Sequence, residues 1–496
     1  MSKLVKQTEL ELKEKIMDAL GRAVADGVLD EAPLPAFIIE VPKERQNGDY
    51  STNVAMAGAK AFHKAPRVIA QAIVDRLDLA DTVFDRAEIA GPGFINFFLG
   101  NRFYAAVLED LMAQGENYGR SDYGKGKRVL VEFVSANPTG PMHIGNARGG
   151  AIGDCLAAVL DWAGYDVQRE FYVNDAGNQI EKFATSLEVR YLQHYDPAVE
   201  LPEDAYKGVD IVEHAENFIK EYGDRYVSAS AEERRKALVD YALPKNIAGL
   251  ERDLGAYRIQ YDRWFKESSL HDKAVDVLGA DHHGYVPRMK AALTALGLDA
   301  NRLDCVIMQM VRLVRDGETI KLSKRSGKAI TLNTLLEEVP IDAARFFFNL
   351  REPNSHFDFD LELAASTSNE NPVYYVQYAH ARICSILRKA AEEGVTLRTP
   401  TTAELELLTA PEERELIRHL AALTDDVVTA AKTYDPAKIT HYVIDLATLF
   451  HKFYNAQRVM VEDEGLMQAR LYLCTAVKNT IRNVLTMLKI SVPERM

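Results

Sequence analysis

Residues 129–146 read VLVEFVSANPTGPMHIGN, and this stretch decides the fold of the central part of the chain. Its first six residues, 129–134, have the length and the branched or aromatic content of a central parallel strand. A Pro/Gly turn at 138–141 then ends the strand. Apolar residues recur at helical spacing after the turn, at Ile152, Leu156, Val159 and Leu160. The stretch therefore predicts a strand, a tight turn and a helix that begins near His143.

The beginning of this helix is a candidate phosphate site, because free backbone N–H groups and the helix dipole favour an anion there. His143 and Asn146 lie at this end, and Gly145 lacks a Cβ, so a ligand can approach the backbone closely. The simpler alternative is a packed strand-turn-helix unit in which His143 only caps the helix. A four-residue H-x-G-N match recurs by chance, so the rest of the chain must decide.

A second candidate is the basic segment 318–328, ETIKLSKRSGK, which follows an apolar stretch at 305–314. Lys321 and Lys324 flank Ser323, a pattern that fits a mobile loop better than a strand or a helix core. Its lysines would face phosphate. The alternative is a solvated surface turn, which most basic runs are.

Together the two segments resemble the HIGH and KMSKS signatures of class I aminoacyl-tRNA synthetases, and the surrounding residues resemble the bacterial type of arginyl-tRNA synthetase. The resemblance covers nearly the whole chain. It also rests on five separate blocks, namely GDYS at 48–51, GPGFIN at 91–96, VEF at 131–133 with Asn137, GADHHGY at 279–285 and NPVYYVQYAH at 371–380.

The resemblance implies an α/β fold with a Rossmann-like class I synthetase catalytic domain, an α+β N-terminal domain and an all-α C-terminal anticodon-binding bundle. We expect residues 1–120 to form the tRNA-contacting N-terminal domain, with a strand at 94–99 and a first helix that carries a capping box at Thr8 and Glu11. Residues 121–365 would form the catalytic domain, interrupted by an Asp/Glu/Tyr-rich insertion near 190–250. Residues 366–496 would form the bundle, whose first helix begins at Pro372.

The implied activity is that of an arginine-tRNA ligase, which forms arginyl-adenylate from L-arginine and ATP and transfers the arginyl group to tRNA(Arg). ATP is a substrate here, and Mg²⁺ would arrive with it rather than in a protein-built cage. The resemblance assigns catalysis to His143, Asn146, Lys321 and Lys324, and further ATP contacts to Gly140, Gly145, Gly279, Asp281 and Ser323. From the pattern alone, Asp281 is at least as well explained as a helix N-cap.

For the amino acid, the resemblance implies Glu132, Ser135 and Asn137 near bound arginine, with His282 close to its carboxylate. A guanidinium needs planar, paired acceptors. Glu132 alternates with apolar neighbours in the predicted strand, where a carboxylate is costly unless it is paired. The alternative is a structural salt bridge between Glu132 and a nearby arginine.

The sequence departs from the family between Leu270 and Gly279, where relatives carry several tens of additional residues, including a strand whose Tyr and Asp grip the arginine side chain. Only residues 271–278 bridge the gap here. A parallel sheet cannot be rejoined by so few residues in the ordinary right-handed way. A tRNA-binding paralogue with impaired catalysis is therefore the alternative function. A nicotinamide-dependent dehydrogenase is excluded because no G-x-G-x-x-G follows the strand.

In the predicted bundle, Tyr374, Tyr378 and Arg382 crowd one helix with groups on which unstacked anticodon bases could stack. The pattern alone favours an amphipathic core helix with tyrosines at its margin; the resemblance reverses that preference. The later run HKFYN at 451–455 is more typical of bundle packing.

Composition fits a cytoplasmic enzyme, which we expect to be a monomer. The net charge of −14 argues against a general nucleic-acid coat, so tRNA must meet local basic patches. The four cysteines contain no C-x-x-C pair, which suggests neither a zinc site nor a disulfide framework. No apolar run approaches membrane-spanning length, and the charged N-terminus is not typical of a signal peptide.

Overall fold

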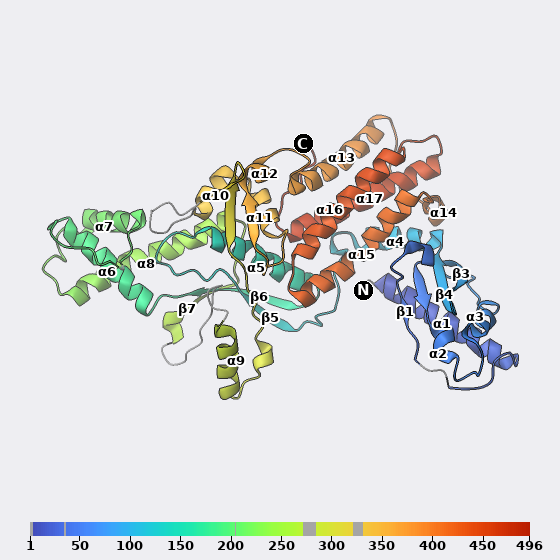
Figure 1. The fold of residues 1–496 in the computed structure, drawn as a ribbon. Coiled ribbons are helices and arrows are strands. Elements are labelled where there is room, and N and C mark those ends of the chain that lie inside the picture. Colours follow the sequence, from blue (N-terminus) through green and yellow to red (C-terminus); the bar gives the residue numbers. More distant parts are fainter. Residues whose placement is uncertain (1–2, 34–35, 204, 271–283, 321–330) are drawn as a thin grey trace.

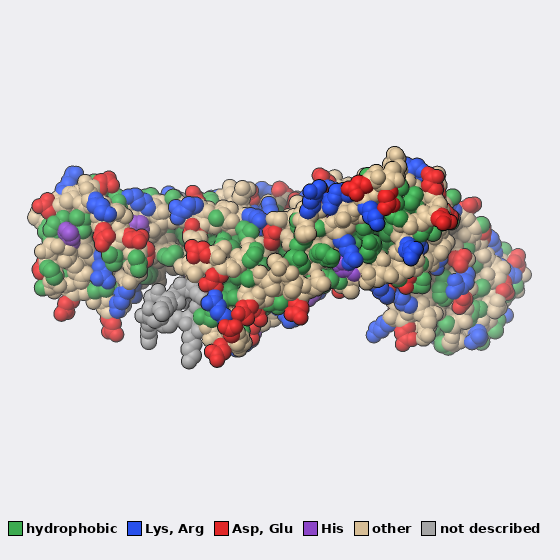
Figure 2. Space-filling view, turned by 90° about the horizontal axis from the view of Figure 1, so that it is seen from above, with side chains coloured by type: hydrophobic (Ala, Val, Ile, Leu, Met, Phe, Trp, Pro, Cys, Tyr) green, Lys and Arg blue, Asp and Glu red, His purple; other side chains and the backbone are tan. Residues whose placement is uncertain are grey.

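The computed structural model describes residues 3–33, 36–203, 205–270, 284–320 and 331–496. The molecule is elongated (Figure 1): three helices, α6 (Asn178–Gln193), α7 (Val209–Tyr222) and α8 (Ala231–Ala256), form one end, and the N-terminal domain forms the other. Figure 2 shows acidic and basic side chains interspersed on the visible face, with several Lys and Arg side chains over the C-terminal bundle. Within the described ranges, no helix combines the length and apolar character needed to cross a bilayer.

The N-terminal domain is built on an antiparallel sheet of order β1-β2-β4-β3. Its elements are α1 (Lys3–Ala25), β1 (Ile39–Glu40), η1 (Arg45–Asn47), β2 (Tyr50–Thr52), α2 (Val54–Gly58), α3 (Pro66–Val74), β3 (Phe84–Ala90), β4 (Phe94–Leu99), α4 (Asn101–Gln114) and η2 (Gly115–Asn117). The strand predicted at 94–99 is confirmed. The capping box at Thr8 and Glu11 is wrong: α1 begins five residues earlier, at Lys3, so Thr8 lies inside the helix and is buried.

The first half of the catalytic domain is a parallel sheet of order β5-β6-β7, with helix α5 connecting its first two strands. Its elements are β5 (Arg128–Glu132), α5 (Ile144–Trp162), β6 (Asp166–Val173) and β7 (Arg263–Lys266). The predicted strand-turn-helix unit is confirmed. The central position predicted for the strand is wrong within the described residues, because β5 pairs there only with β6, and Leu130 is 53% exposed.

The insertion lies between β6 and β7 and carries its own hydrophobic core, separate from the main one. Seven side chains form this core, namely Phe183, Leu187, Tyr191, Ile211, Phe218, Leu238 and Ala242. An apolar core of this kind lets α6, α7 and α8 pack as a unit. The helical part starts earlier than the composition indicated, at Asn178.

The second half of the catalytic domain contains a separate sheet of order β10-β8-β9, in which β8 and β10 are parallel. Its elements are η3 (Glu267–Leu270), α9 (Tyr285–Ala295), η5 (Ala300–Arg302), β8 (Val311–Arg315), β9 (Glu318–Thr319), α10 (Leu332–Glu338), α11 (Ile341–Phe348), β10 (Phe357–Asp360) and α12 (Leu361–Ala365). Among the described residues, no ladder joins this sheet to the β5-β6-β7 sheet. The two halves instead meet through α5, which contacts α10, α11 and β8.

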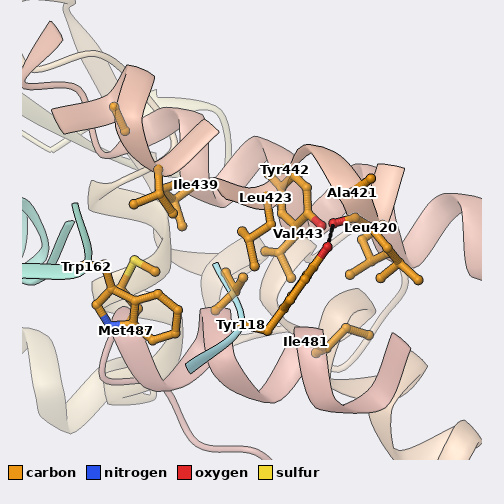
Figure 3. Close-up of a cluster of buried hydrophobic side chains, with 14 of the residues drawn as sticks. Tyr118, Trp162, Leu420, Ala421, Leu423, Ile439, Tyr442, Val443, Ile481 and Met487 are labelled. Carbon is orange, nitrogen blue, oxygen red and sulfur yellow. Dashed lines mark hydrogen bonds between the residues drawn. The ribbon is translucent and has the colours of Figure 1, made fainter. Parts of the chain in front are cut away.

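The C-terminal bundle consists of α13 (Pro372–Glu392), α14 (Thr402–Leu405), α15 (Pro411–Thr433), α16 (Ala437–Ala456) and α17 (Glu464–Met487). The helix predicted from Pro372 is confirmed, with Asn371 as its N-cap. Figure 3 shows Tyr118 and Trp162 among the buried side chains of the bundle. The Tyr118 hydroxyl donates to Leu420 O at 2.9 Å, so the chain that enters the catalytic domain is fixed to α15.

Arg345 joins the catalytic domain to the bundle. Its side chain is fully buried and donates to Asp154 Oδ2 on α5 at 2.6 Å. It also donates to Tyr257 O, directly after α8, and to Leu488 O, directly after α17, both at 3.0 Å. One guanidinium therefore fixes α5 relative to α11 and the last bundle helix.

Candidate active site

The loop after β5 has an unusual backbone. Val134 and Ser135 have φ angles of 69° and 39°. A β-branched residue such as valine rarely adopts positive φ, and such conformations persist only where the surrounding structure enforces them. This reversal turns Ser135 back toward the end of the strand, where its Oγ donates to Glu132 Oε1 at 2.8 Å and accepts from Tyr172 N–H at 3.2 Å.

Glu132 is the electrostatic centre of this loop. Burial raises the pKa of its carboxyl to about 7; the Ser135 hydrogen bond opposes this rise, and the nearby Glu170 adds to it. Glu170 stands directly opposite Glu132 on β6 and is 7% exposed. No arginine or lysine of the described residues forms an ion pair with Glu132, so the structural salt bridge considered as an alternative is absent from this part of the chain.

His143 and Asn146 form the N-terminal end of α5, as predicted. The His143 Nδ1 accepts from Gly145 N–H at 3.1 Å, and the Asn146 Oδ1 accepts from His143 N–H at 3.1 Å. A Cβ on Gly145 would lie 3.0 Å from the imidazole Cε1, so the space that this glycine leaves open is used by the His143 ring. The capping role considered for His143 is therefore present, and it orients the imidazole at the helix end.

The insertion contacts the Pro/Gly turn, which the sequence did not predict. The Asn246 side chain on α8 donates to Pro138 O at 2.9 Å and also bonds His214 Nε2 at 2.7 Å. On α7, Asp210 Oδ2 lies 3.3 Å from the position of a Cβ on Gly140, and burial raises the pKa of its carboxyl. The acidic composition of 190–250 was the only signal for these residues, and it does not say which of them reach the turn.

Asn137 is exposed in the same loop, and its side chain approaches that of Asn174, after β6, to 3.2 Å. Glu132, Ser135, Asn137, Gly140, His143, Gly145 and Asn146 are thus collected between β5 and α5. Six predicted site residues lie outside the described residues, namely Gly279, Asp281, His282, Lys321, Ser323 and Lys324.

The first residues described after these lysines lie beside the N-terminal end of α5. Thr331, the first residue described after 320, forms an antiparallel bridge with His143. Leu332 N–H donates to Met142 O at 3.0 Å, and Thr331 caps α10. Lys324 is seven residues from Thr331, a span of at most about 25 Å.

On the bundle, Tyr374, Tyr378 and Arg382 follow one another at four-residue spacing along α13, and all three are half-buried. The two tyrosine rings stack with centroids 6.3 Å apart. The Arg382 guanidinium lies 5.8 Å from the Tyr378 ring and 4.5 Å from that of Tyr454. We call Tyr374, Tyr378 and Arg382 the aromatic row.

The packing predicted for 451–455 is confirmed at Phe453, which is fully buried, and wrong at Asn455, which is exposed in the last turn of α16. No group of three or more His, Cys, Asp or Glu side chains within the described ranges could hold a metal ion.

Three family descriptions match the chain in order. Residues 10–99 match the arginyl tRNA synthetase N terminal domain, residues 107–248 the tRNA synthetases class I (R) catalytic domain, and residues 376–496 the DALR anticodon binding domain. The fold is therefore that of a class I aminoacyl-tRNA synthetase. The predicted fold class is confirmed.

Two curated relatives are similar over their full length. The arginine-tRNA ligase of Caldanaerobacter subterraneus is 46% identical and that of Acetivibrio thermocellus 45%, with 100% of each chain covered. The solved Thermus thermophilus arginyl-tRNA synthetase shares the fold, with a TM-score of 0.65 at 21% identity over 97% of this chain and 99% of that one. The chain belongs to the arginyl-tRNA synthetase family, the ligases that join arginine to tRNA.

The comparison with the Caldanaerobacter enzyme also bears on the departure from the family. Its alignment runs over 562 positions, whereas the chain has 496 residues. Several tens of positions of that relative therefore have no counterpart in this chain. The comparisons nevertheless favour the ligase, and nothing in them favours the catalytically impaired paralogue.

Proposed function

We propose that this chain forms arginyl-adenylate in the loop between β5 and α5 and then transfers the arginyl group to the 3′ adenosine of tRNA(Arg). The observation that carries this proposal is Glu132: a half-buried carboxylate, held by a hydroxyl, that has no cation partner among the described residues and lies at the same loop as a helix N-terminus. A bound guanidinium would supply the missing charge.

In this proposal Glu132, Ser135 and Asn137 contact arginine, with His282 toward its carboxylate. Gly140, His143, Gly145 and Asn146 contact ATP at the helix end, where backbone N–H groups favour phosphate. Gly279 and Asp281 take the remaining nucleotide contacts. Asp210 and Asn246 support the turn from the insertion.

The chemistry requires placement and charge more than a nucleophilic side chain. The arginine carboxylate attacks the α-phosphorus of ATP, a P–O bond breaks, and pyrophosphate leaves, so negative charge develops on phosphate oxygens. His143 and Asn146 would donate to these oxygens, while Lys321 and Lys324, with Ser323 between them, would neutralise the pyrophosphate side. The bridge between Thr331 and His143 supports this assignment because it brings the chain that follows the lysines to the helix end. Mg²⁺ would enter with ATP.

The aromatic row is our proposed contact for tRNA. Its tyrosines are half-buried rather than enclosed, so their ring faces can stack unpaired bases, and Arg382 adds a cation beside them. We further propose domains at 1–120, 121–365 and 366–496, a monomeric state and a cytoplasmic location.

The test is ATP–pyrophosphate exchange in the presence of tRNA(Arg) and arginine. We expect His143→Ala and Lys324→Ala each to slow exchange by at least about tenfold while the protein stays folded, because both groups contact the transition state. Arg312→Gln, which changes an exposed pair with Asp358 away from the loop, is the control. Unchanged exchange in both variants would refute the assignment.

A further inference from the structure

Arg148 is a buried cation that has no role in the function proposed above. It lies on α5, five residues after His143, and its side chain is fully buried. No carboxylate in the described parts of the chain pairs with it, and burial lowers the pKa of its guanidinium to about 10. A buried charge without a counter-ion is costly, so its retention needs a reason.

Backbone carbonyls from two separate segments accept its hydrogen bonds. The Nη1 donates to Gln309 O at 2.7 Å and to Ser355 O at 3.2 Å, and the Nη2 donates to Ser355 O at 3.2 Å and to Glu352 O at 3.3 Å. The guanidinium also lies 5.6 Å from the Phe357 ring. Gln309 N–H donates to Pro353 O at 2.9 Å, so the two segments are also tied to each other.

These segments lead directly into the second sheet. Gln309 precedes β8, and the turn at 352–355 precedes β10, the strand that pairs with β8. No backbone ladder of the described residues connects this sheet to β5-β6-β7. Arg148 therefore fixes the start of β8 and of β10 against the helix that carries His143. β8 precedes the basic segment in the chain, and β9 is formed by the first two residues of that segment.

We infer that Arg148 is a positioning residue for adenylate formation: it sets the half of the catalytic domain that supplies Lys321 and Lys324 against the helix end that carries His143. The inference rests on the proposed function, because it assigns the basic segment to the phosphates of ATP.

The type of side chain supports a positional role. A planar guanidinium presents its N–H donors in a fixed fork and can serve three carbonyls at once, whereas a lysine ammonium is a compact point charge on a flexible stem. If Arg148 acts by holding the three carbonyls in position, lysine cannot replace it. If Arg148 acts only through its positive charge, lysine can replace it.

The inference also separates the substrates. Three of the four proposed arginine contacts, Glu132, Ser135 and Asn137, belong to the first half, and the aromatic row belongs to the bundle. Displacement of the second half should therefore change arginine and tRNA binding far less than it changes adenylate formation. A side chain that only stabilises the fold would alter all activities together.

The experiment compares Arg148→Met and Arg148→Lys with Arg312→Gln, which breaks a bidentate but exposed pair between the same strands, β8 and β10. The measurements are tRNA-dependent pyrophosphate exchange, arginine affinity by calorimetry and tRNA affinity by filter binding, at a temperature where circular dichroism shows every variant folded. Arg148→Lys keeps the inference testable if Arg148→Met does not fold.

We expect both Arg148 variants to lower kcat for exchange by at least about tenfold while arginine and tRNA affinities stay within about twofold, and Arg312→Gln to match the wild-type chain. Wild-type exchange by Arg148→Lys would overturn the inference, as would a parallel loss of arginine and tRNA binding. An inactive wild-type chain would instead refute the proposed function.

Discussion

Asp154 and Glu132 are two carboxylates of the same half-domain, and their surroundings differ. Asp154 is 2% exposed and lies 2.6 Å from Arg345 and 3.4 Å from Arg169. Glu132 is half-buried, and its carboxylate accepts a hydrogen bond from the Ser135 hydroxyl. Removing a carboxylate from water is costly unless a cation compensates it. The fold itself compensates Asp154, whereas Glu132 keeps its capacity for a cation from outside.

This difference separates a structural charge, Asp154, from a charge that we propose binds arginine, Glu132, within one α/β unit. Asp154 joins α5 to α11, and through Arg345 to the end of α17, so its role is to hold domains together. Glu132 stands at the carboxyl end of β5, the edge at which parallel sheets bind ligands. Neutralising Glu132 should therefore weaken arginine binding, whereas neutralising Asp154 should lower the stability of the fold.

The largest expected effect is that of Glu132→Gln. The amide keeps the shape but removes the charge that would pair with a guanidinium, and loss of one partner of a buried charge pair costs several kcal/mol, so kcat/KM for arginine should fall about a thousandfold. Aminoacylation over a range of arginine concentrations measures this, and the thermal unfolding temperature should not fall. A variant that keeps wild-type KM for arginine would remove Glu132 from the binding site.

The counterpart is Asp154→Asn, which leaves Arg345 and Arg169 without their carboxylate. We expect about 3 kcal/mol lower unfolding free energy, measured by urea denaturation, because the remaining guanidinium is buried and uncompensated. KM for arginine should stay close to the wild-type value. Asp358→Asn, in an exposed pair, is the matched control and should cost less than about 1 kcal/mol. Equal losses of unfolding free energy in the two variants would contradict the structural role of Asp154.

The sequence pattern, together with the resemblance, predicted a role in arginine binding for Glu132, whereas no feature of the sequence singled out Asp154. Glu132 alternates with apolar residues in a strand that meets a Pro/Gly turn, and His143 follows the turn at the start of a periodic helix; both signals are local. Asp154 and Arg148 are ordinary members of a helical pattern. Their partners, Arg345 and the carbonyls at 309 and 352–355, lie far away in the sequence, and only tertiary packing brings them together.

The dependence on tertiary packing also explains the other differences between the sequence-based predictions and the structure. Val129 to Val134 has the composition of a central strand, yet pairing depends on which strands the rest of the chain provides, and here the described residues provide one neighbour. Asp210 and Asn246 reach the turn because the insertion packs as a unit, which composition does not reveal. The lysines at 321 and 324, by contrast, were recognised by motif and remain predictions.

A smaller effect, on tRNA affinity, should follow from removing one ring of the aromatic row. Tyr378→Ala removes the ring that contacts both Tyr374 and Arg382, and base–aromatic stacking contributes about 1–3 kcal/mol per base, so tRNA affinity should fall about tenfold. Filter binding measures it. Tyr472→Ala, at another half-buried tyrosine of the bundle, should leave tRNA affinity near the wild-type value. Equal effects of the two changes would assign Tyr378 to general packing.

The smallest effect concerns pH and refines the contrast between the two carboxylates. Burial raises the pKa of Glu132 from 4.5 to about 7, so in the folded chain without ligand this group is half-protonated near neutrality. Only the carboxylate attracts a guanidinium. Arginine affinity should therefore rise about threefold between pH 6.5 and 7.5, and Glu132→Gln should abolish this dependence.

Stability should change in the opposite direction. Because the folded chain binds this proton more tightly than the unfolded chain, the contribution of Glu132 is fully present below about pH 4.5 and is lost as the pH rises through about 7. Glu132→Gln should consequently unfold at a higher temperature than the wild-type chain at pH 8 and at nearly the same temperature at pH 4.5, measured by calorimetry without ligand. A constant difference across this range would mean that Glu132 is ionised throughout, and therefore that a cation already compensates it in the free protein.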